Sequence, residues 1–335
     1  MHAITQIEID QQVYNLYDEY CHGRIDRREF LKRAGTLGAA ALVMAQGLMP
    51  DYARAQTISF TDSRIKAQYV TYPSPGGNGA SMRGYLAQPA GQGPFPAVLV
   101  VHENRGLNPY IEDVARRAAV EGFVALAPDG LAPLGGYPGN DDDGRDLQAK
   151  LDQAKLRTDM LNSARFLKSH KLSSGRLGAT GFCWGGGTTN YLAVAMGDDL
   201  HAAVPFYGAA AETASVPKIK AALLVHYAEN DERINNMWPA YEKALKASGV
   251  RQRCTCIRAP STVFTTTRRR ATTSPQRSSR GKGPWPSSRG TWLGHRTPGP
   301  ADGVLPAGHA LLPFSGVHAG LEAARGFPVL RELVA

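Results

Sequence analysis

Between about residues 59 and 250, apolar segments of strand length alternate with segments of helical length, and this alternation constrains the fold most. Phe95–His102 reads F-P-A-V-L-V-V-H, a continuous apolar run typical of a strand buried on both faces. Further strands are expected over 66–73, 81–88, 123–127, 176–182, 202–206 and 221–227, and helices over 109–121, 146–170, 188–196 and 238–247. The first two strands of that list look like an antiparallel pair. The order predicts an α/β fold whose mainly parallel sheet has helices on both faces.

The positive charge of the chain is concentrated in one segment. The net charge is +9, and Arg251–Pro300 alone contains 11 Lys or Arg and no Asp or Glu. This segment shows no nucleic-acid-binding motif and no pattern of aromatic side chains for stacking on bases, so we expect no nucleic-acid partner. Thr, Arg, Ser and Pro dominate after Val250, and amphipathic periodicity is lost. We therefore predict an incomplete α/β domain over 56–250 and a basic, disordered tail over 251–335.

The N-terminal segment has the composition of an export signal. Residues 26–33 read D-R-R-E-F-L-K-R, a mildly apolar stretch continues to Met49, and Ala53-Arg54-Ala55 provides an A-x-A cleavage signal. Together these features resemble a twin-arginine leader. They predict a leader over 1–55, the twin-arginine export machinery as a partner, and a periplasmic or secreted protein.

Two other properties of this segment limit that interpretation. The apolar stretch is too short and too rich in Gly and Ala for a spanning helix, so no stable membrane anchor is expected. The alternative is an ordinary amphipathic N-terminal helix in which the arginine pair has no role. The spacing of Ile7, Val13, Leu16 and Tyr17 fits a short helix of that kind.

The strongest chemical signal is Gly181-Phe182-Cys183-Trp184-Gly185-Gly186, between an expected strand and an expected helix. A G-x-nucleophile-x-G turn in this context holds its central residue in a strained, exposed conformation. Its glycines are required because a Cβ would collide with the neighbouring strand and helix. The helix N-terminus favours a thiolate at Cys183, and the Trp184 N–H can donate to an oxyanion. The alternative is a Gly-rich turn with a structural cysteine.

Two polar segments follow other expected strands. Glu103 and Asn104 lie in V-H-E-N-R-G, where Asn104 is placed to supply a second oxyanion N–H and the Glu103 carboxylate can approach the thiol. Asp231 ends A-E-N-D after the 221–227 strand and would orient a catalytic histidine. The alternatives are a polar loop end for the first segment and a helix cap at Asp231 for the second.

From about Gln68 to Val250 the chain resembles the dienelactone hydrolase family. The resemblance is carried by V-L-V-V-H-E-N-R-G, A-P-D-G, G-F-C-W-G-G, P-F-Y-G and A-E-N-D. It implies an α/β-hydrolase fold and a triad of Cys183, a histidine and Asp231, with Glu103 as the partner of the thiol. It also implies hydrolysis of a small ester or lactone through an acyl-thioester, with neither a cofactor nor a metal.

The histidine that the resemblance implies is missing from its expected place. It should follow a final strand near position 261, but 259–264 reads A-P-S-T-V-F. Codons for 254–265 can be chosen so that a shift of one nucleotide yields M-Y-M-Y-P-G-T-Q-H-G-F-H, and the same shift in 280–289 yields A-W-E-R-T-M-A-F-F-K. These peptides match the family's histidine loop and a closing helix. We therefore interpret the tail as frameshifted, with the last strand and helix missing.

Two functional hypotheses follow for the chain as written. The first is a hydrolase by descent whose turnover is impaired, because Cys183 lacks its general base. His309, in P-A-G-H-A, is a weak candidate replacement whose surroundings slightly resemble a histidine loop, although it lies far beyond Asp231. The second is an inactive remnant that still binds a small carboxylate. Binding of nucleic acid through the basic tail is a third and weaker alternative.

Overall fold

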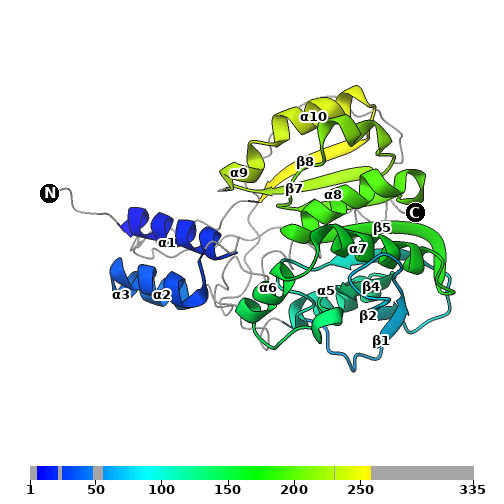
Figure 1. The fold of residues 1–335 in the computed structure, drawn as a ribbon, viewed down its shortest axis with the longest axis horizontal. Coiled ribbons are helices and arrows are strands. Elements are labelled where there is room, and N and C mark those ends of the chain that lie inside the picture. Colours follow the sequence, from blue (N-terminus) through cyan, green and yellow to red (C-terminus); the bar gives the residue numbers. More distant parts are fainter. Residues whose placement is uncertain (1–5, 22–24, 48–55, 230, 258–335) are drawn as a thin grey trace, which may run out of the picture. The chain divides into compact units, whose positions relative to one another are not determined.

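The computed structural model describes residues 6–21, 25–47, 56–229 and 231–257. Its centre is one eight-stranded sheet, shown in Figure 1. The strands are β1 (Ile65–Pro73), β2 (Ser81–Pro89), β3 (Phe95–Val101), β4 (Val124–Asp129), β5 (Ser173–Phe182), β6 (Ala202–Phe206), β7 (Ala222–Ala228) and β8 (Gln252–Ile257). Their order is β1-β2-β4-β3-β5-β6-β7-β8. The β1–β2 and β2–β4 pairs are antiparallel and all others are parallel.

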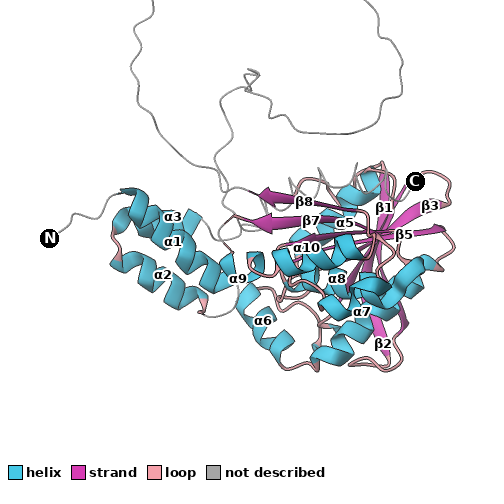
Figure 2. Cartoon of the chain, turned by 90° about the horizontal axis from the view of Figure 1, so that it is seen from above, coloured by secondary structure: helices cyan, strands magenta, loops and turns pink. Residues whose placement is uncertain are grey.

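Helices cover both faces of this sheet (Figure 2). They are α5 (Pro109–Val120), α6 (Asp141–Ala149), α7 (Gln153–Lys168), α8 (Trp184–Met196), α9 (Glu232–Asn235) and α10 (Trp238–Ala247). Short 3₁₀ turns span η1 (Ala132–Leu134), η2 (Gly197–Asp199) and η3 (Thr213–Lys218). The apolar side of α5 joins one core cluster, and those of α7, α8 and α10 join the other. This architecture confirms the predicted α/β-hydrolase fold.

The long helix expected over 146–170 is two helices. The helix α6 ends at Ala149, and α7 begins after Asp152. The Asp152 side chain accepts hydrogen bonds from the backbone N–H groups of Ala154 and Lys155, at 2.9 and 3.1 Å. An aspartate that caps a helix in this way satisfies donors that would otherwise have no partner, so it starts a new helix.

The prediction that the last strand is missing was wrong. β8 pairs in parallel with β7 from the Leu223–Gln252 pair to the Ala228–Ile257 pair. Six residues with backbone hydrogen bonds along β7 suffice for a strand at the sheet edge, where periodicity is a weak guide. The domain boundary expected at residue 250 therefore cuts through the sheet. The remainder of the predicted tail, including His309, lies outside the described residues.

The N-terminal region contains three helices: α1 (Gln6–Cys21), α2 (Arg27–Thr36) and α3 (Ala39–Gly47). We call them the N-terminal helices. They enclose an apolar cluster of their own, formed by Val13, Tyr17, Tyr20, Ile25, Phe30, Ala34, Ala41 and Ala45. Arg27 and Arg28 begin α2 and are exposed, after the N-cap Asp26. No helix in the described part of the chain is long and apolar enough to span a membrane.

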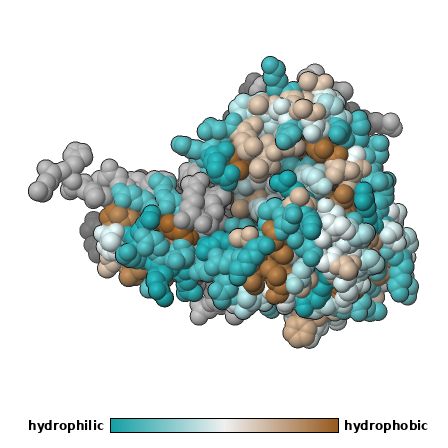
Figure 3. Space-filling model, viewed as in Figure 1, coloured by the Kyte–Doolittle hydropathy of each residue, from teal (hydrophilic) through white to brown (hydrophobic). Residues whose placement is uncertain are grey.

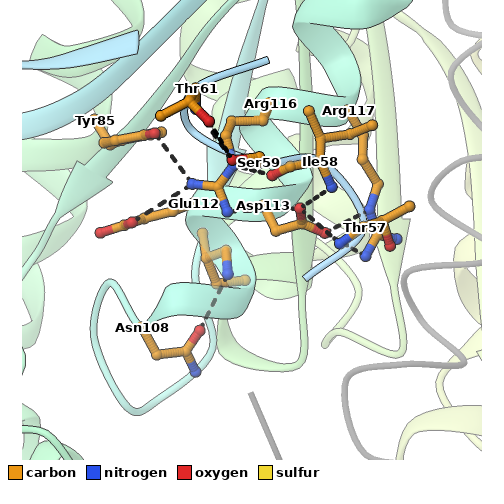
Figure 4. Close-up of polar contacts among 11 residues, drawn as sticks. Thr57, Ile58, Ser59, Thr61, Tyr85, Asn108, Glu112, Asp113, Arg116 and Arg117 are labelled. Atoms are coloured by element: carbon orange, nitrogen blue, oxygen red, sulfur yellow. Dashed lines mark hydrogen bonds and ion pairs between the residues drawn. The ribbon is translucent and has the colours of Figure 1, made fainter. Parts of the chain in front are cut away.

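A polar network attaches the segment before β1 to α5 (Figure 4). The buried Asp113 carboxylate accepts from the backbone N–H groups of Thr57 and Ile58 at 3.1 and 2.8 Å. Arg116 donates to the Ile58 carbonyl at 2.7 Å and to the Tyr85 hydroxyl at 3.1 Å. Because Asp113 and Arg116 are buried, these hydrogen bonds hold Thr57 and Ile58 against α5.

Most of the face seen in Figure 3 is hydrophilic, and its hydrophobic residues form small patches. Only five large apolar side chains of the described residues are strongly exposed: Val43, Phe60, Tyr69, Leu134 and Met237. Exposed apolar residues that are scattered in this way are usual for a folded domain and need no partner to explain them.

Candidate active site

Cys183 lies where β5 ends and α8 begins. Its backbone has φ 53° and ψ −113°, in a region that non-glycine residues rarely adopt. Its N–H donates to the Phe206 carbonyl at 3.0 Å, which ties the turn to the end of β6. The strained backbone and the position at a helix N-terminus agree with the expected nucleophile elbow.

The glycines around Cys183 have no room for a side chain. A Cβ at Gly181 would lie 2.4 Å from the Gly185 carbonyl oxygen. A Cβ at Gly185 would lie 2.4 Å from the His102 carbonyl oxygen and 2.5 Å from that of Val101. These atoms belong to the backbone and cannot swing away, which confirms the expected steric requirement. The elbow is therefore pressed against the loop that follows β3.

His102 begins that loop and both its ring nitrogens are engaged. Nδ1 donates to the Glu103 carbonyl at 2.5 Å, and Nε2 accepts from the Gly130 N–H at 3.1 Å. The ring stacks on Trp184, with 5.6 Å between centroids and an interplanar angle of 15°. Burial lowers the pKa of His102, which favours the neutral ring. Its role is to join the two loops, and it has no nitrogen left to act as a base.

Glu103 and Asn104 follow His102 at the same edge of the sheet. The Tyr207 hydroxyl lies 3.5 Å from Glu103 Oε1 and points its O–H toward that carboxylate. The Asn104 Oδ1 atom is buried and has no hydrogen-bond partner among the described residues. Tyr207 was not predicted as a site residue. The sequence contained one pointer to it, the P-F-Y-G segment at the carboxyl end of an expected strand, whereas its φ of 38° is seen only in the structure.

Asp231 lies just beyond β7. Its residue is 5% exposed, and Oδ1 accepts from the Ile234 N–H at 3.1 Å, so it caps α9. The helix-capping role of Asp231, which the sequence left as an alternative, is therefore confirmed. The second carboxylate oxygen of Asp231 can accept from another partner. Because β5, β6 and β7 are parallel neighbours, Cys183, Tyr207 and Asp231 follow carboxyl ends at one edge of the sheet.

Four histidines fall within the described residues, and none occupies the expected position of the base. His102 is fully engaged, as described above. His170 and His201 precede the amino ends of β5 and β6, at the opposite edge. His226 stacks on Phe206, in the cluster that contains α5, with 4.4 Å between centroids, and its Nδ1 lies 2.5 Å from Thr255 Oγ1. Positions 261 and 309 lie outside the described residues.

The fold and this edge of the sheet define an α/β-hydrolase. Residues 82–278 match the model of the dienelactone hydrolase family, and the chain belongs to this family of ester and lactone hydrolases. The match extends beyond the boundary expected at residue 250. A second family model, described as YqhI-like, matches residues 1–40.

Two sequence relatives agree with this assignment, and one solved structure is reported beside them as a similarity. An Escherichia coli (strain K12) protein named "Putative hydrolase fragment YghX" is 62% identical over 113 residues, which cover 33% of this chain and 96% of that protein. A "Putative carboxymethylenebutenolidase" of Methylorubrum extorquens is 35% identical over 178 residues, covering 52% of this chain and 60% of the relative. A crystal structure titled as a putative dienelactone hydrolase from Klebsiella pneumoniae is 28% identical, covers 57% of this chain and 85% of its own, and has a TM-score of 0.48.

Proposed function

We propose that this hydrolase cleaves a small ester or lactone through an acyl-thioester on Cys183. The thiolate attacks the carbonyl carbon, and the C=O electron pair moves to oxygen. Collapse of this oxyanion breaks the C–O bond. The leaving oxygen takes up the proton that Glu103 removed from the thiol, and it departs as the alcohol or, for a lactone, becomes the hydroxyl of the opened ring. Water then hydrolyses the thioester to the acid and regenerates the thiol.

The observation that carries this proposal is the backbone of Cys183. Cys183 has a strained backbone with φ 53°, and it lies between Gly181 and Gly185, neither of which has room for a Cβ. This strain costs conformational free energy, and strain of this kind is typical of positions that present a reactive group. In our proposal the N–H groups of Trp184 and Asn104 stabilise the oxyanion, and Glu103 takes the thiol proton. Asp231 belongs to the same site as the partner of a histidine.

We further propose that the chain as written is acylated but turns over slowly. No described histidine lies where the base is expected, and the codon for the histidine would straddle Ser261 and Thr262 in the shifted frame. His309 is a distant substitute. Without the histidine that would activate water, the thioester is hydrolysed only by unassisted attack of water. A chain that cannot complete the cycle would act as a carboxylate-binding remnant, which is our second candidate function.

Rapid mixing with p-nitrophenyl acetate tests the proposal, because nitrophenolate leaves without needing a proton. We expect a burst of about one nitrophenolate per chain followed by slow release, as for an enzyme whose deacylation is limiting. Cys183→Ala should show no burst, and Cys254→Ala should keep it. The proposal fails if the wild-type chain shows no burst or if Cys183→Ala shows the same burst.

We also propose export through the twin-arginine pathway. The support is the exposed Arg27–Arg28 pair, the weakly apolar stretch that follows it, and the A-x-A signal before Gln56. Fractionation of cells that express the full chain tests this proposal. Export predicts protein in the periplasm or medium, and retention in the cytoplasm after Arg27→Lys/Arg28→Lys. Equal distribution of the two chains would contradict it.

A further inference from the structure

The loop with Glu103 and Asn104 continues into a buried ion pair. Arg105 Nη1 lies 2.8 Å from Asp141 Oδ2 at the start of α6, and both side chains are 6% exposed. The Tyr137 hydroxyl donates to the other oxygen of Asp141 at 2.9 Å. A buried pair of this kind depends on every group that keeps water from it, because losing one contact exposes or unpairs a charge.

One of those groups is Tyr20 of α1. The guanidinium carbon of Arg105 lies 4.9 Å from the centroid of the Tyr20 ring, within the range of a cation–π contact. Tyr20 is only 2% exposed, and its ring stacks on Phe30 of α2 at 5.6 Å. The ring therefore joins the core of the N-terminal helices to the loop after β3.

The rest of this loop has little freedom to move. A Cβ at Gly144 of α6 would lie 2.3 Å from the Arg105 carbonyl oxygen. Gly106 has φ +82°, and its Cβ would lie 2.4 Å from Leu131. Gly185 presses against His102 at the other end, as described above. The loop is thus held by backbone contacts at Gly144 and Gly185 and by the Leu131 side chain at Gly106. The Arg105 side chain is its contact with Tyr20.

The N-terminal helices also contact α6 directly. Arg145 Nη1 donates to the Ile25 carbonyl at 3.3 Å, and the Arg27 N–H donates to Asp142 Oδ2 at 3.4 Å. These contacts involve the same helix that supplies Asp141. The contact of Tyr20 with Arg105 is therefore one of several between the N-terminal helices and this region. The helix α6 carries both Asp141, which pairs with Arg105, and the residues that bind Ile25 and Arg27.

We propose that Tyr20 is a positioning residue for the catalytic loop. Its ring keeps Arg105 paired with Asp141 and out of water, which fixes the backbone that presents Glu103 and Asn104 to Cys183. This inference rests on the proposed function of Cys183. It makes the N-terminal helices part of the working hydrolase while they are attached, in addition to any role in export.

The test compares three substitutions in the full chain. Tyr20→Phe keeps the ring, Tyr20→Leu keeps an apolar side chain but removes the ring, and Val13→Ala weakens the cluster of the N-terminal helices away from Arg105. The first readout is the rate constant of the nitrophenolate burst. The second is hydrogen exchange of the backbone amides over 102–108, which requires no catalysis.

We expect Tyr20→Leu to slow the burst about tenfold and to speed exchange in the loop, at unchanged burst amplitude. Tyr20→Phe and Val13→Ala should stay within about twofold of wild type, since neither removes the ring from Arg105. Arg105→Lys, which keeps the charge but loses the planar guanidinium, should slow the burst similarly. Combining it with Tyr20→Leu should then add little.

The proposal is overturned if Tyr20→Leu matches wild type in both readouts, or if Val13→Ala slows the burst as much as Tyr20→Leu does. The second result would mean that only the general stability of the N-terminal helices matters. Absence of a burst in the wild-type chain would instead refute the function of Cys183. In that case hydrogen exchange still decides whether Tyr20 holds the loop.

Discussion

Gly185 of α8 packs directly on the backbone of His102, so that a Cβ on this glycine would lie 2.4 Å from the His102 carbonyl oxygen. The contact couples the nucleophile elbow to the loop with Glu103 and Asn104. Neither partner has a flexible side chain at the point of contact. The geometry of the site is therefore set by backbone packing, and it should tolerate no added atom there.

We accordingly expect Gly185→Ala to destabilise the fold by about 1–3 kcal/mol and to abolish the burst, because two carbonyl groups must move. Gly187→Ala is the matched control on the same helix. Its Cβ would meet the nearest atom, the Ala209 nitrogen, at 3.4 Å, an ordinary contact. Urea denaturation and burst amplitude measure both effects. Equal behaviour of the two variants would contradict the packing argument.

Glu103 provides a test of the proton transfer. Glu103→Gln should slow the burst about 100-fold near neutral pH, since it removes the group that takes the thiol proton. The loss should shrink at higher pH, where the thiol ionises without help. Tyr207→Phe, which removes the hydroxyl 3.5 Å from Glu103, is the control and should change the rate within about threefold. A pH-independent loss in Glu103→Gln would assign Glu103 a structural role only.

His226 gives the folded chain a defined response to acid. Burial, with Arg253 nearby, lowers the pKa of His226 from 6.5 to about 4. The unfolded chain binds a proton at His226 between these values and the folded chain does not. The free energy of unfolding therefore falls as the pH drops from 6.5 to about 4, by at most about 3 kcal/mol.

Denaturation of the His226→Phe variant across this pH range checks that response. Phenylalanine keeps a ring against Phe206 but cannot take up a proton. We expect a lower stability at pH 7, because Thr255 loses its partner, and a smaller slope between pH 6.5 and 4. A slope equal to that of the wild-type chain would show that other groups cause the acid response.

Restoring the reading frame from codon 253 onward should convert the burst into turnover. The restored peptide places a histidine after β8, where it can activate water for deacylation, and we expect the slow phase to accelerate by roughly 10² to 10⁴. Cys183→Ala in the restored chain is the control for background hydrolysis. An unchanged slow phase would contradict the idea that a missing histidine limits the cycle.

Much of the fold could be predicted because its strands are buried. The Phe95–Val101 and Ala202–Phe206 strands are continuous apolar runs, and both were located within a residue or two. The elbow could be predicted because only glycine fits at positions 181 and 185, on either side of Cys183. Short glycine-flanked turns of this kind leave a direct record in the sequence.

The misjudged features depend on tertiary contacts. β8 contains Arg253 and two cysteines, and its alternation covers only R-C-T-C, yet pairing with β7 suffices to form it. The break between α6 and α7 comes from a cap at Asp152 inside a stretch of helical composition. Tyr20 matters through Arg105, a partner far away in the sequence, so local pattern alone could not find it. The P-F-Y-G segment placed Tyr207 after a strand, but its partner Glu103 also lies far away in the sequence.

The most direct test of the central claim is to locate the acyl group after brief reaction of the full chain with p-nitrophenyl acetate. The reaction is quenched in acid, the protein is digested, and the peptides are analysed by mass spectrometry. We predict acetylation of the peptide that contains Cys183, removable by neutral hydroxylamine as expected for a thioester. Acetylation confined to Cys254, Cys256 or a lysine would contradict Cys183 as the nucleophile.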